Sequence, residues 1–199
     1  FFMTHQHTKN PLNIIVIIAA LGYFVDIYDL ILFGIVRTPS LKGLGVTDPQ
    51  LILDYGVHLI STQMVGMLVG GILWGVMGDK KGRVSVLFGS ILLYSLANIA
   101  NAYVMPIADL TGLSMIDTYT VLRFIAGVGL AGELGAGITL VNETMTKEHR
   151  GYGTMVVVSF GVLGAVFANL LAEFANQWYG EAEGWRISYI VGGIMGLVL

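Results

Sequence analysis

The sequence contains no cysteine and few charged residues. Without cysteine, disulfide bonds and thiolate metal sites are excluded, and the sequence predicts neither a metal nor a cofactor. Asp, Glu, Lys and Arg make up only 12% of the 199 residues, about half the fraction of a typical soluble domain. The net charge of -3 argues against a nucleic-acid partner, and 4 Pro are too few for a proline-rich disordered chain.

Apolar residues occupy the rest of the chain in long blocks, 55% of all residues, with a mean hydropathy of +0.78. A membrane-spanning helix needs about 20 residues. Five blocks reach that length and a sixth is incomplete; they lie near 13–36, 55–77, 84–105, 119–142, 152–176 and 186–199. A soluble helical core would show polar residues at a period of about 3.6, and SILLYSLANIANAYV shows few. The sequence therefore predicts an all-α membrane protein.

The distribution of Lys and Arg predicts the orientation, because cytoplasmic loops carry an excess of both. They gather in the N-terminal segment and in two loops, as Lys9, Lys80, Lys81, Arg83, Lys147 and Arg150. We expect residues 1–12 to be a cytoplasmic segment and residues 13–199 to be one transmembrane bundle, in a bacterial cytoplasmic (inner) membrane. The N-terminus has no signal-peptide cleavage pattern, so the first span is expected to be retained. Phe in place of an initial Met indicates a fragment or a truncated chain.

Two carboxylates interrupt the first apolar block, in GYFVDIYDLILFG. Asp26 and Asp29 are three residues apart, so they share one helix face. A charge at the membrane centre costs at least about 2.5–3.5 kcal/mol on insertion scales, so it persists beside water, a partner charge or a proton. Glu133 interrupts the fourth block at nearly the same depth, and Arg123, nearer the outside, is predicted to pair with Asp29. A structural ion pair with a protonated Glu133 is the alternative.

The stretch GVMGDKKGR joins the second and third blocks and has the most specific spacing in the chain. Glycine permits the reversal because it tolerates positive φ angles. The stretch resembles the major facilitator superfamily signature G-x-x-x-D-[RK]-x-G-[RK]-[RK]. The matching residues are Gly75, Asp79, Lys80, Gly82 and Arg83, whereas Val84 departs from the pattern.

Three further motifs carry the same resemblance. VLRFIAGVGLAG is similar to the helix 4 pattern R-x-x-x-G-x-G, at Arg123, Gly127 and Gly129. ETMTKEHRG is similar to the E-x(6)-R-G of the helix 4–5 loop, at Glu143, Arg150 and Gly151, and GWR at 184–186 resembles the entry to helix 6.

The resemblance implies six transmembrane helices in a 3+3 inverted repeat, the N-terminal half of a twelve-helix transporter that works by alternating access. The expected partners are the missing C-terminal half, the lipid bilayer, a small solute and protons. It also implies a cytoplasmic gate bonded by Asp79, Arg83, Glu143 and Arg150, in which Gly75, Lys80 and Gly82 complete the loop. Partly exposed pairs worth about 0–1 kcal/mol each suit bonds that must break. A loop that only sets orientation is the alternative.

Two symporter families within the superfamily compete. GYFVDIYDL resembles the helix 1 signature of phosphate:proton symporters, and AGELGAG resembles the G-G-E-[YF]-G of metabolite:proton symporters, with Leu134 where an aromatic is usual. The resemblance implies proton-coupled symport of a small anionic or zwitterionic metabolite. Its site would use Asp26, Asp29, Arg123 and Glu133 around a central cavity between helices 1 and 4, with Tyr28 and Gln63 by analogy. A sugar or phosphate transporter, or a uniporter, is the alternative.

Two details of that site are expected from the residues themselves. Glu133, with no obvious cation near it in the sequence, is expected to be the acid that exchanges the proton. Tyr28 lies about 100° around the helix from each aspartate, so it is also open to facing a neighbouring helix.

An enzyme is the main rival function. Intramembrane aspartyl proteases use Y-D on one helix and G-x-G-D on the next. Tyr28 and Asp29 supply the first half, but Leu130 stands where the second acid is needed. We therefore predict no enzymatic activity. A non-transporting six-helix assembly or sensor subunit is a third possibility, with no soluble domain in this chain to transmit a signal.

Overall fold

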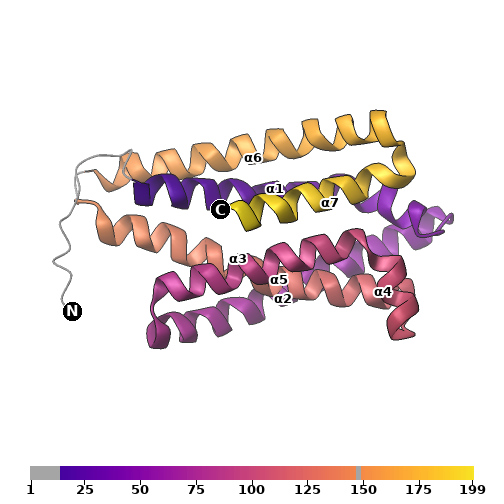
Figure 1. Ribbon diagram of the computed structural model, residues 1–199, viewed down its shortest axis with the longest axis horizontal. Coiled ribbons are helices and arrows are strands. Elements are labelled where there is room, and N and C mark those ends of the chain that lie inside the picture. Colours follow the sequence, from indigo (N-terminus) through magenta and orange to yellow (C-terminus); the bar gives the residue numbers. More distant parts are fainter. Residues whose placement is uncertain (1–13, 147–148) are drawn as a thin grey trace.

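The structure, a computed structural model, describes residues 14–146 and 149–199, except for the side chains at 15, 83–84 and 133–144. Its elements are all helices (Figure 1). In chain order they are α1 (Ile14–Gly43), α2 (Pro49–Lys81), α3 (Arg83–Ala102), α4 (Val104–Thr111), α5 (Met115–Thr144), α6 (Arg150–Tyr179) and α7 (Glu181–Val198). The all-α prediction is confirmed.

The long helices run side by side along the longest axis of the molecule (Figure 1). α1 packs against α6, and α2 packs against α5. α3 lies against α5 and α7, and α7 also contacts α1 and α6. The first helix of each triplet, α1–α3 and α5–α7, thus packs on the second helix of the other triplet, as expected for a 3+3 inverted repeat.

Glycines allow α2 and α5 to approach closely. A Cβ added at Gly66 or Gly70 would overlap the backbone carbonyl oxygens of Phe124 and Val128, whereas nothing lies within 4 Å of a Cβ added at Gly71. Small residues at the interface of membrane helices permit such contact between backbones. This packing brings the polar side chains of α2 and α5 within bonding distance.

Within the described residues, four helices are long and apolar enough to cross a membrane, namely α1, α2, α3 and α6. α4 and the described part of α5 meet the same test together, as a pair bent by 111°. The helices extend beyond the predicted apolar blocks, since α1 continues to Gly43 and α2 begins at Pro49. At the start of α2, the Asp48 carboxylate accepts a hydrogen bond from the backbone N–H of Gln50 at 2.8 Å. Such capping extends a helix into polar sequence.

The short helix α4 was not predicted from the sequence. It begins at the end of the third apolar block and ends at Thr111, and its C-cap is Gly112, whose φ of 73° is in the left-handed region. Glycine is favoured there because it has no Cβ to clash with the backbone. α4 turns the chain between α3 and α5 at the end of the bundle opposite the α2–α3 turn (Figure 1).

Candidate functional site

The most deeply buried charges lie where α1, α2 and α5 meet. Arg123 of α5 is fully buried, and its Nη2 lies 3.4 Å from Oδ2 of the equally buried Asp29 of α1. Gln63 of α2 bridges the pair. Its Oε1 accepts a hydrogen bond from Arg123 Nη2 at 2.6 Å, and its Nε2 donates to Asp29 Oδ2 at 3.3 Å. The pairing of Asp29 with Arg123 predicted from their depths is present, and Gln63 belongs to the same cluster.

The ion pair itself is loose. Tight buried pairs are bidentate and have their remaining donors and acceptors satisfied. Here a single contact of 3.4 Å joins the charges. Within the part of the chain that the structure describes, Nε and Nη1 of Arg123 and Oδ1 of Asp29 form no hydrogen bond. Both partners thus have polar atoms that no described residue satisfies.

Aromatic rings enclose the arginine from two further directions. The guanidinium carbon of Arg123 lies 4.3 Å from the centre of the Phe33 ring and 5.6 Å from that of Tyr189. The Tyr189 hydroxyl lies 2.7 Å from that of Tyr119, which in turn donates to Ser40 Oγ at 3.1 Å. All four of these surrounding residues are buried. Nothing in the sequence marks these four residues, because each is an ordinary residue in an apolar span and they come from three helices.

Of the other two predicted acids, Asp26 and Glu133, the structure describes the side chain of Asp26 alone. Asp26 is fully buried on α1. Glu133 lies on α5, but its side chain falls outside the described residues. Tyr28 is fully buried, and its hydroxyl donates to the backbone carbonyl of Ser188 on α7 at 2.7 Å. Tyr28 was expected either to line the site or to face a neighbouring helix. In the structure it faces a neighbouring helix, α7.

The burial of the cluster corrects one expectation. Asp29 and Arg123 were expected to line a central cavity between the first and fourth spans, which correspond to α1 and α5. Instead both have no exposed surface, and Gln63 is 1% exposed. The reason is the rotation of α1, which turns Asp29 toward α2 and α5 inside the bundle. The charges of Asp29 and Arg123 therefore lie inside the helical bundle and not at its surface.

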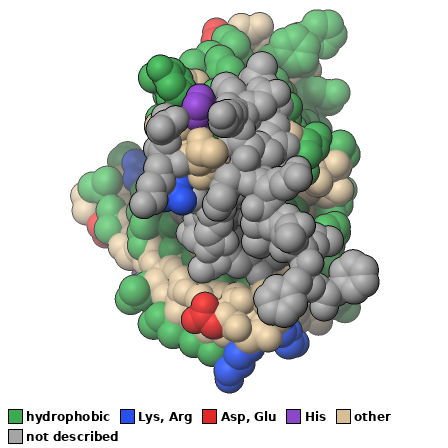
Figure 2. Space-filling model, turned by 90° about the vertical axis from the view of Figure 1, so that its left-hand side faces the viewer, with side chains coloured by type: hydrophobic (Ala, Val, Ile, Leu, Met, Phe, Trp, Pro, Cys, Tyr) green, Lys and Arg blue, Asp and Glu red, His purple; other side chains and the backbone are tan. Residues whose placement is uncertain are grey.

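The predicted gate residues lie at the end of the bundle where α2 meets α3. Figure 2 shows Lys and Arg side chains at the rim of this end, near an acidic side chain. Gly82 makes the turn with a φ of 87°, and its N–H donates to the Gly78 carbonyl at 3.0 Å. Asp79 and Lys80 are exposed on the last turn of α2, and a Cβ at Gly75 would meet nothing within 4 Å.

The bonding set predicted for the gate is not assembled among its described members. Arg150 Nε donates to the backbone carbonyl of Met145 at 3.2 Å, and no ion pair between Asp79 and Arg150 occurs among the described side chains. The physical reason is that α2 packs on α5 and α3, whereas α6 packs on α1 and α7. The side chains of Arg83 and Glu143 lie outside the described residues.

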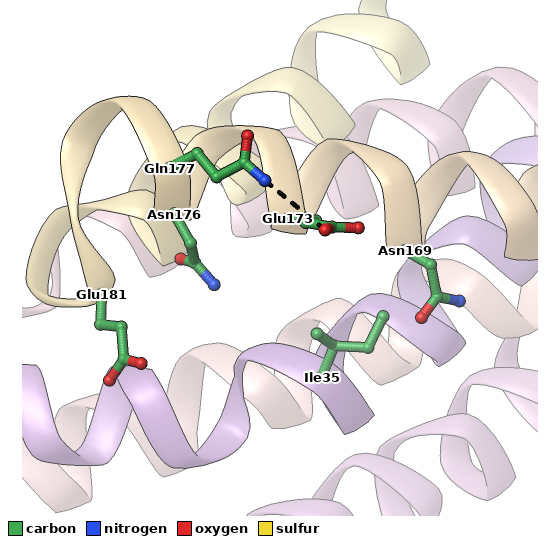
Figure 3. A pocket seen from close by; sticks show the side chains of 6 residues that line it. All are labelled: Ile35, Asn169, Glu173, Asn176, Gln177 and Glu181. Atoms are coloured by element: carbon green, nitrogen blue, oxygen red, sulfur yellow. Dashed lines mark hydrogen bonds between the residues drawn. The ribbon is translucent and has the colours of Figure 1, made fainter.

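A polar pocket of about 440 Å³ opens between α1, α6 and the start of α7 (Figure 3). Its lining residues are Ile35, Asn169, Glu173, Asn176, Gln177 and Glu181. Gln177 Nε2 donates to Glu173 Oε1 at 3.5 Å, and the Asn169 amide donates to the Ala165 carbonyl at 3.0 Å. The helical spacing of Asn169, Glu173 and Asn176 is visible in the sequence, but the contribution of α1 and α7 is not.

These features define a class of protein: a helical membrane bundle with two inverted triplets and a charged cluster in its core. The family model described as the Major Facilitator Superfamily matches residues 19–199. The chain therefore belongs to that family of transporters, and the aspartyl-protease alternative is wrong.

Individual relatives agree with this assignment. The niacin transporter NiaP of Acinetobacter baylyi is 29% identical over 89% of this chain and 36% of its own length. The sialic acid transporter NanX of Escherichia coli is 31% identical over 87% of this chain and 38% of its own length. An inward-open structure of the xylose transporter XylE from E. coli superposes with a TM-score of 0.69 at 19% identity, over 92% of this chain and 45% of XylE. The chain thus spans less than half the length of each of these three proteins.

Proposed function

We propose that this chain is the N-terminal half of a proton-coupled symporter for a small anionic or zwitterionic metabolite, and that Asp26, Asp29 and Glu133 are its proton-binding group. The observation that carries the proposal is the cluster of Asp29, Gln63 and Arg123, a loose ion pair with no exposed surface inside a membrane bundle. Ionisable groups at membrane depth are costly, and they mark proton relays and solute pathways.

The geometry suggests how a proton would act. Asp29 and Arg123 share one contact, and Gln63 holds both through its two ends. A proton that Glu133 passes to Asp29 within this group would remove the charge attraction, while Gln63 would still accept from the arginine. The arginine would then be attracted more strongly to a second carboxylate or to an anionic solute nearby. Loading of a proton and loading of an anion would thus favour each other, which is the thermodynamic requirement for symport.

The substrate class rests on the named relatives and on charge. NiaP and NanX are named as transporters of niacin and of sialic acid, and both compounds carry a carboxylate. Within this bundle, the described buried charges comprise one arginine with two aspartates. Protonation of those acids would reduce repulsion of an incoming anion.

The exposed apolar surface of the bundle suits contact with a second half of the transporter and with lipid. Large apolar side chains are exposed along α2 and α6, among them Leu68 at 68%, Ile72 at 66% and Val162 at 61%. Surfaces of this kind mark protein or membrane contacts. We propose that the end with the α2–α3 turn faces the cytoplasm, because Lys80, Lys81 and Arg150 lie there. We expect the 199-residue chain alone not to transport.

Uptake by the full-length transporter that contains this chain tests the proposal. Proteoliposomes are offered radiolabelled niacin, sialic acid, glycine betaine, phosphate and xylose, with and without an inward proton gradient. We expect a gradient to concentrate at least one carboxylate. Uptake that ignores the gradient would instead indicate a uniporter, and gradient-driven uptake of phosphate or xylose alone would contradict the proposed substrate class.

A single variant tests the proposed coupling acid. We expect Glu133→Gln to abolish gradient-driven accumulation while sparing solute exchange at equal pH, since exchange needs no net proton movement. Glu173→Gln, on the exposed face of α6, is the matched control and should retain accumulation. If Glu133→Gln still concentrates solute, Glu133 is not the coupling acid and Asp26 is the next candidate.

A further inference from the structure

Arg123 has three kinds of partner: the Asp29 carboxylate, the Gln63 amide and two aromatic rings. Asp29 is the acid that pairs with it in the described part of the bundle. Once Asp29 takes a proton, a fully buried guanidinium would lose its counter-charge, and an unpaired buried charge is strongly destabilising. Gln63 would then keep its hydrogen bond to the arginine but supplies no counter-charge, so the proton cycle proposed above needs a further group to hold the guanidinium.

The faces of two aromatic rings lie close enough to Arg123 to hold its guanidinium. Phe33 is one turn of α1 beyond Asp29, and its ring centre lies 4.3 Å from the guanidinium carbon of Arg123. Tyr189 of α7 presents its ring at 5.6 Å. Aromatic faces carry negative potential and attract cations within about 6 Å, most strongly where water is excluded. Both rings lie in that range and are buried.

A third ring and a chain of hydroxyls keep the two rings in place. Tyr119 stands edge-on to both, at 6.2 Å and 89° from Phe33 and at 6.4 Å and 89° from Tyr189. Its hydroxyl donates to Ser40 Oγ at 3.1 Å, so its oxygen accepts from the Tyr189 hydroxyl at 2.7 Å. Ser40 Oγ donates onward to the Arg37 carbonyl at 2.9 Å. The rings are thus oriented by contacts that do not involve Asp29.

We propose that Phe33 and Tyr189 form an aromatic clamp that holds the Arg123 guanidinium without Asp29, so that Asp29 can exchange its ion pair for a proton while the arginine stays buried. The clamp residues are positioning residues that act through Arg123. The role in proton exchange rests on the proposed function, whereas the holding of Arg123 does not. The clamp also ties α7 to the ion pair, because Tyr189 is its contribution.

Among the described residues, the other titratable groups around Asp29 and Arg123 lie on three helices. α1 itself carries Asp26 and Tyr28, α5 carries Tyr119, α3 carries Tyr94, and α2 contributes Gln63, which does not titrate. α6 faces the region with Phe167, which packs on Tyr28 at 5.9 Å. The described part of the cluster therefore contains one cation, and the clamp acts on that cation alone.

A double-mutant cycle tests the clamp independently of transport. The full-length protein is unfolded with SDS in mixed micelles, with and without Asp29→Asn and with and without Phe33→Leu. We expect Phe33→Leu to lower the folding equilibrium constant about tenfold more in the Asp29→Asn background, because the arginine has then lost its counter-charge and depends on Gln63 and the rings. Equal effects of Phe33→Leu in both backgrounds would overturn the proposal. Phe24→Leu, whose ring packs on Phe167 at 5.8 Å, is the matched control and should be additive.

The pH dependence of uptake tests the link to proton exchange. We expect Phe33→Leu and Tyr189→Leu to move the pH of half-maximal uptake lower by about one unit, since the arginine then depends more on an ionised Asp29. Tyr189→Phe keeps the ring and should leave that pH within about 0.3 units. If Tyr189→Phe shifts the profile as much as Tyr189→Leu, the hydroxyl and not the ring acts, and the clamp is refuted. If the wild-type protein shows no proton dependence, the proposed function fails, while the double-mutant cycle still decides the clamp.

Discussion

Gln63 is the residue whose replacement most directly tests the buried cluster. Its amide serves two opposite charges, since Oε1 accepts from Arg123 at 2.6 Å and Nε2 donates to Asp29 at 3.3 Å. Hydrogen bonds to charged groups contribute about 1.5–3 kcal/mol each, so the short bond and the long bond together are worth about 4 kcal/mol. We therefore expect Gln63→Leu, which keeps the volume, to lower the free energy of unfolding by about 3–5 kcal/mol.

Unfolding in mixed SDS micelles measures this loss. Gln177→Leu is the matched control, because Gln177 is exposed and its bond to Glu173 is 3.5 Å long; its cost should stay within about 0.5 kcal/mol. Gln63→Glu separates the two ends of the amide. It keeps an acceptor for Arg123 but places a second carboxylate against Asp29, so stability and uptake should recover as the pH falls and one shared proton restores the lost donor. A cost below about 1 kcal/mol for Gln63→Leu, or no recovery of Gln63→Glu at acid pH, would refute the bridging role.

Three further outcomes are expected. Asp79→Asn should weaken cytoplasmic closure in the full-length protein and raise cysteine labelling at the inner mouth; unchanged labelling with lost solute affinity would make the α2–α3 turn part of the binding site. Gly66→Ala should lower the free energy of unfolding by about 1–3 kcal/mol because its Cβ overlaps the Phe124 carbonyl, whereas Gly71→Ala has open space and should be neutral or stabilising. Asn169→Cys in the polar pocket should react with a membrane-impermeant thiol reagent added outside, and labelling only from the inside would reverse the proposed orientation.

Much of the fold was readable from the sequence, because the quantities involved are local. The length and apolarity of a block decide whether it can cross a bilayer, and α1, α2, α3 and α6 meet that test. Depth along a helix follows from counting residues at about 1.5 Å each. That count paired Asp29 with Arg123, which lie 94 positions apart and in contact. The glycine-rich turn before α3 was likewise visible, and Gly82 adopts the positive φ that it permits.

The direction in which each side chain points was decided only by the tertiary structure. In a soluble helix the polar face marks the side away from the core, but a membrane helix is apolar toward lipid and toward its neighbours alike. Its rotation is therefore set by packing. Close contact of α2 with α5 at Gly66 and Gly70 turns Gln63 and Arg123 toward Asp29, and the same rotation buries these charges inside the bundle.

The aromatic surroundings of Arg123 show the same limit. Phe33, Tyr119 and Tyr189 come from α1, α5 and α7, and nothing in their local sequence distinguishes them from other aromatic residues in the spans. A residue's spacing along one helix determines which of its own neighbours share a face. Whether faces of three helices meet depends on how all three helices pack together. Only that packing places two aromatic rings within about 6 Å of the buried guanidinium.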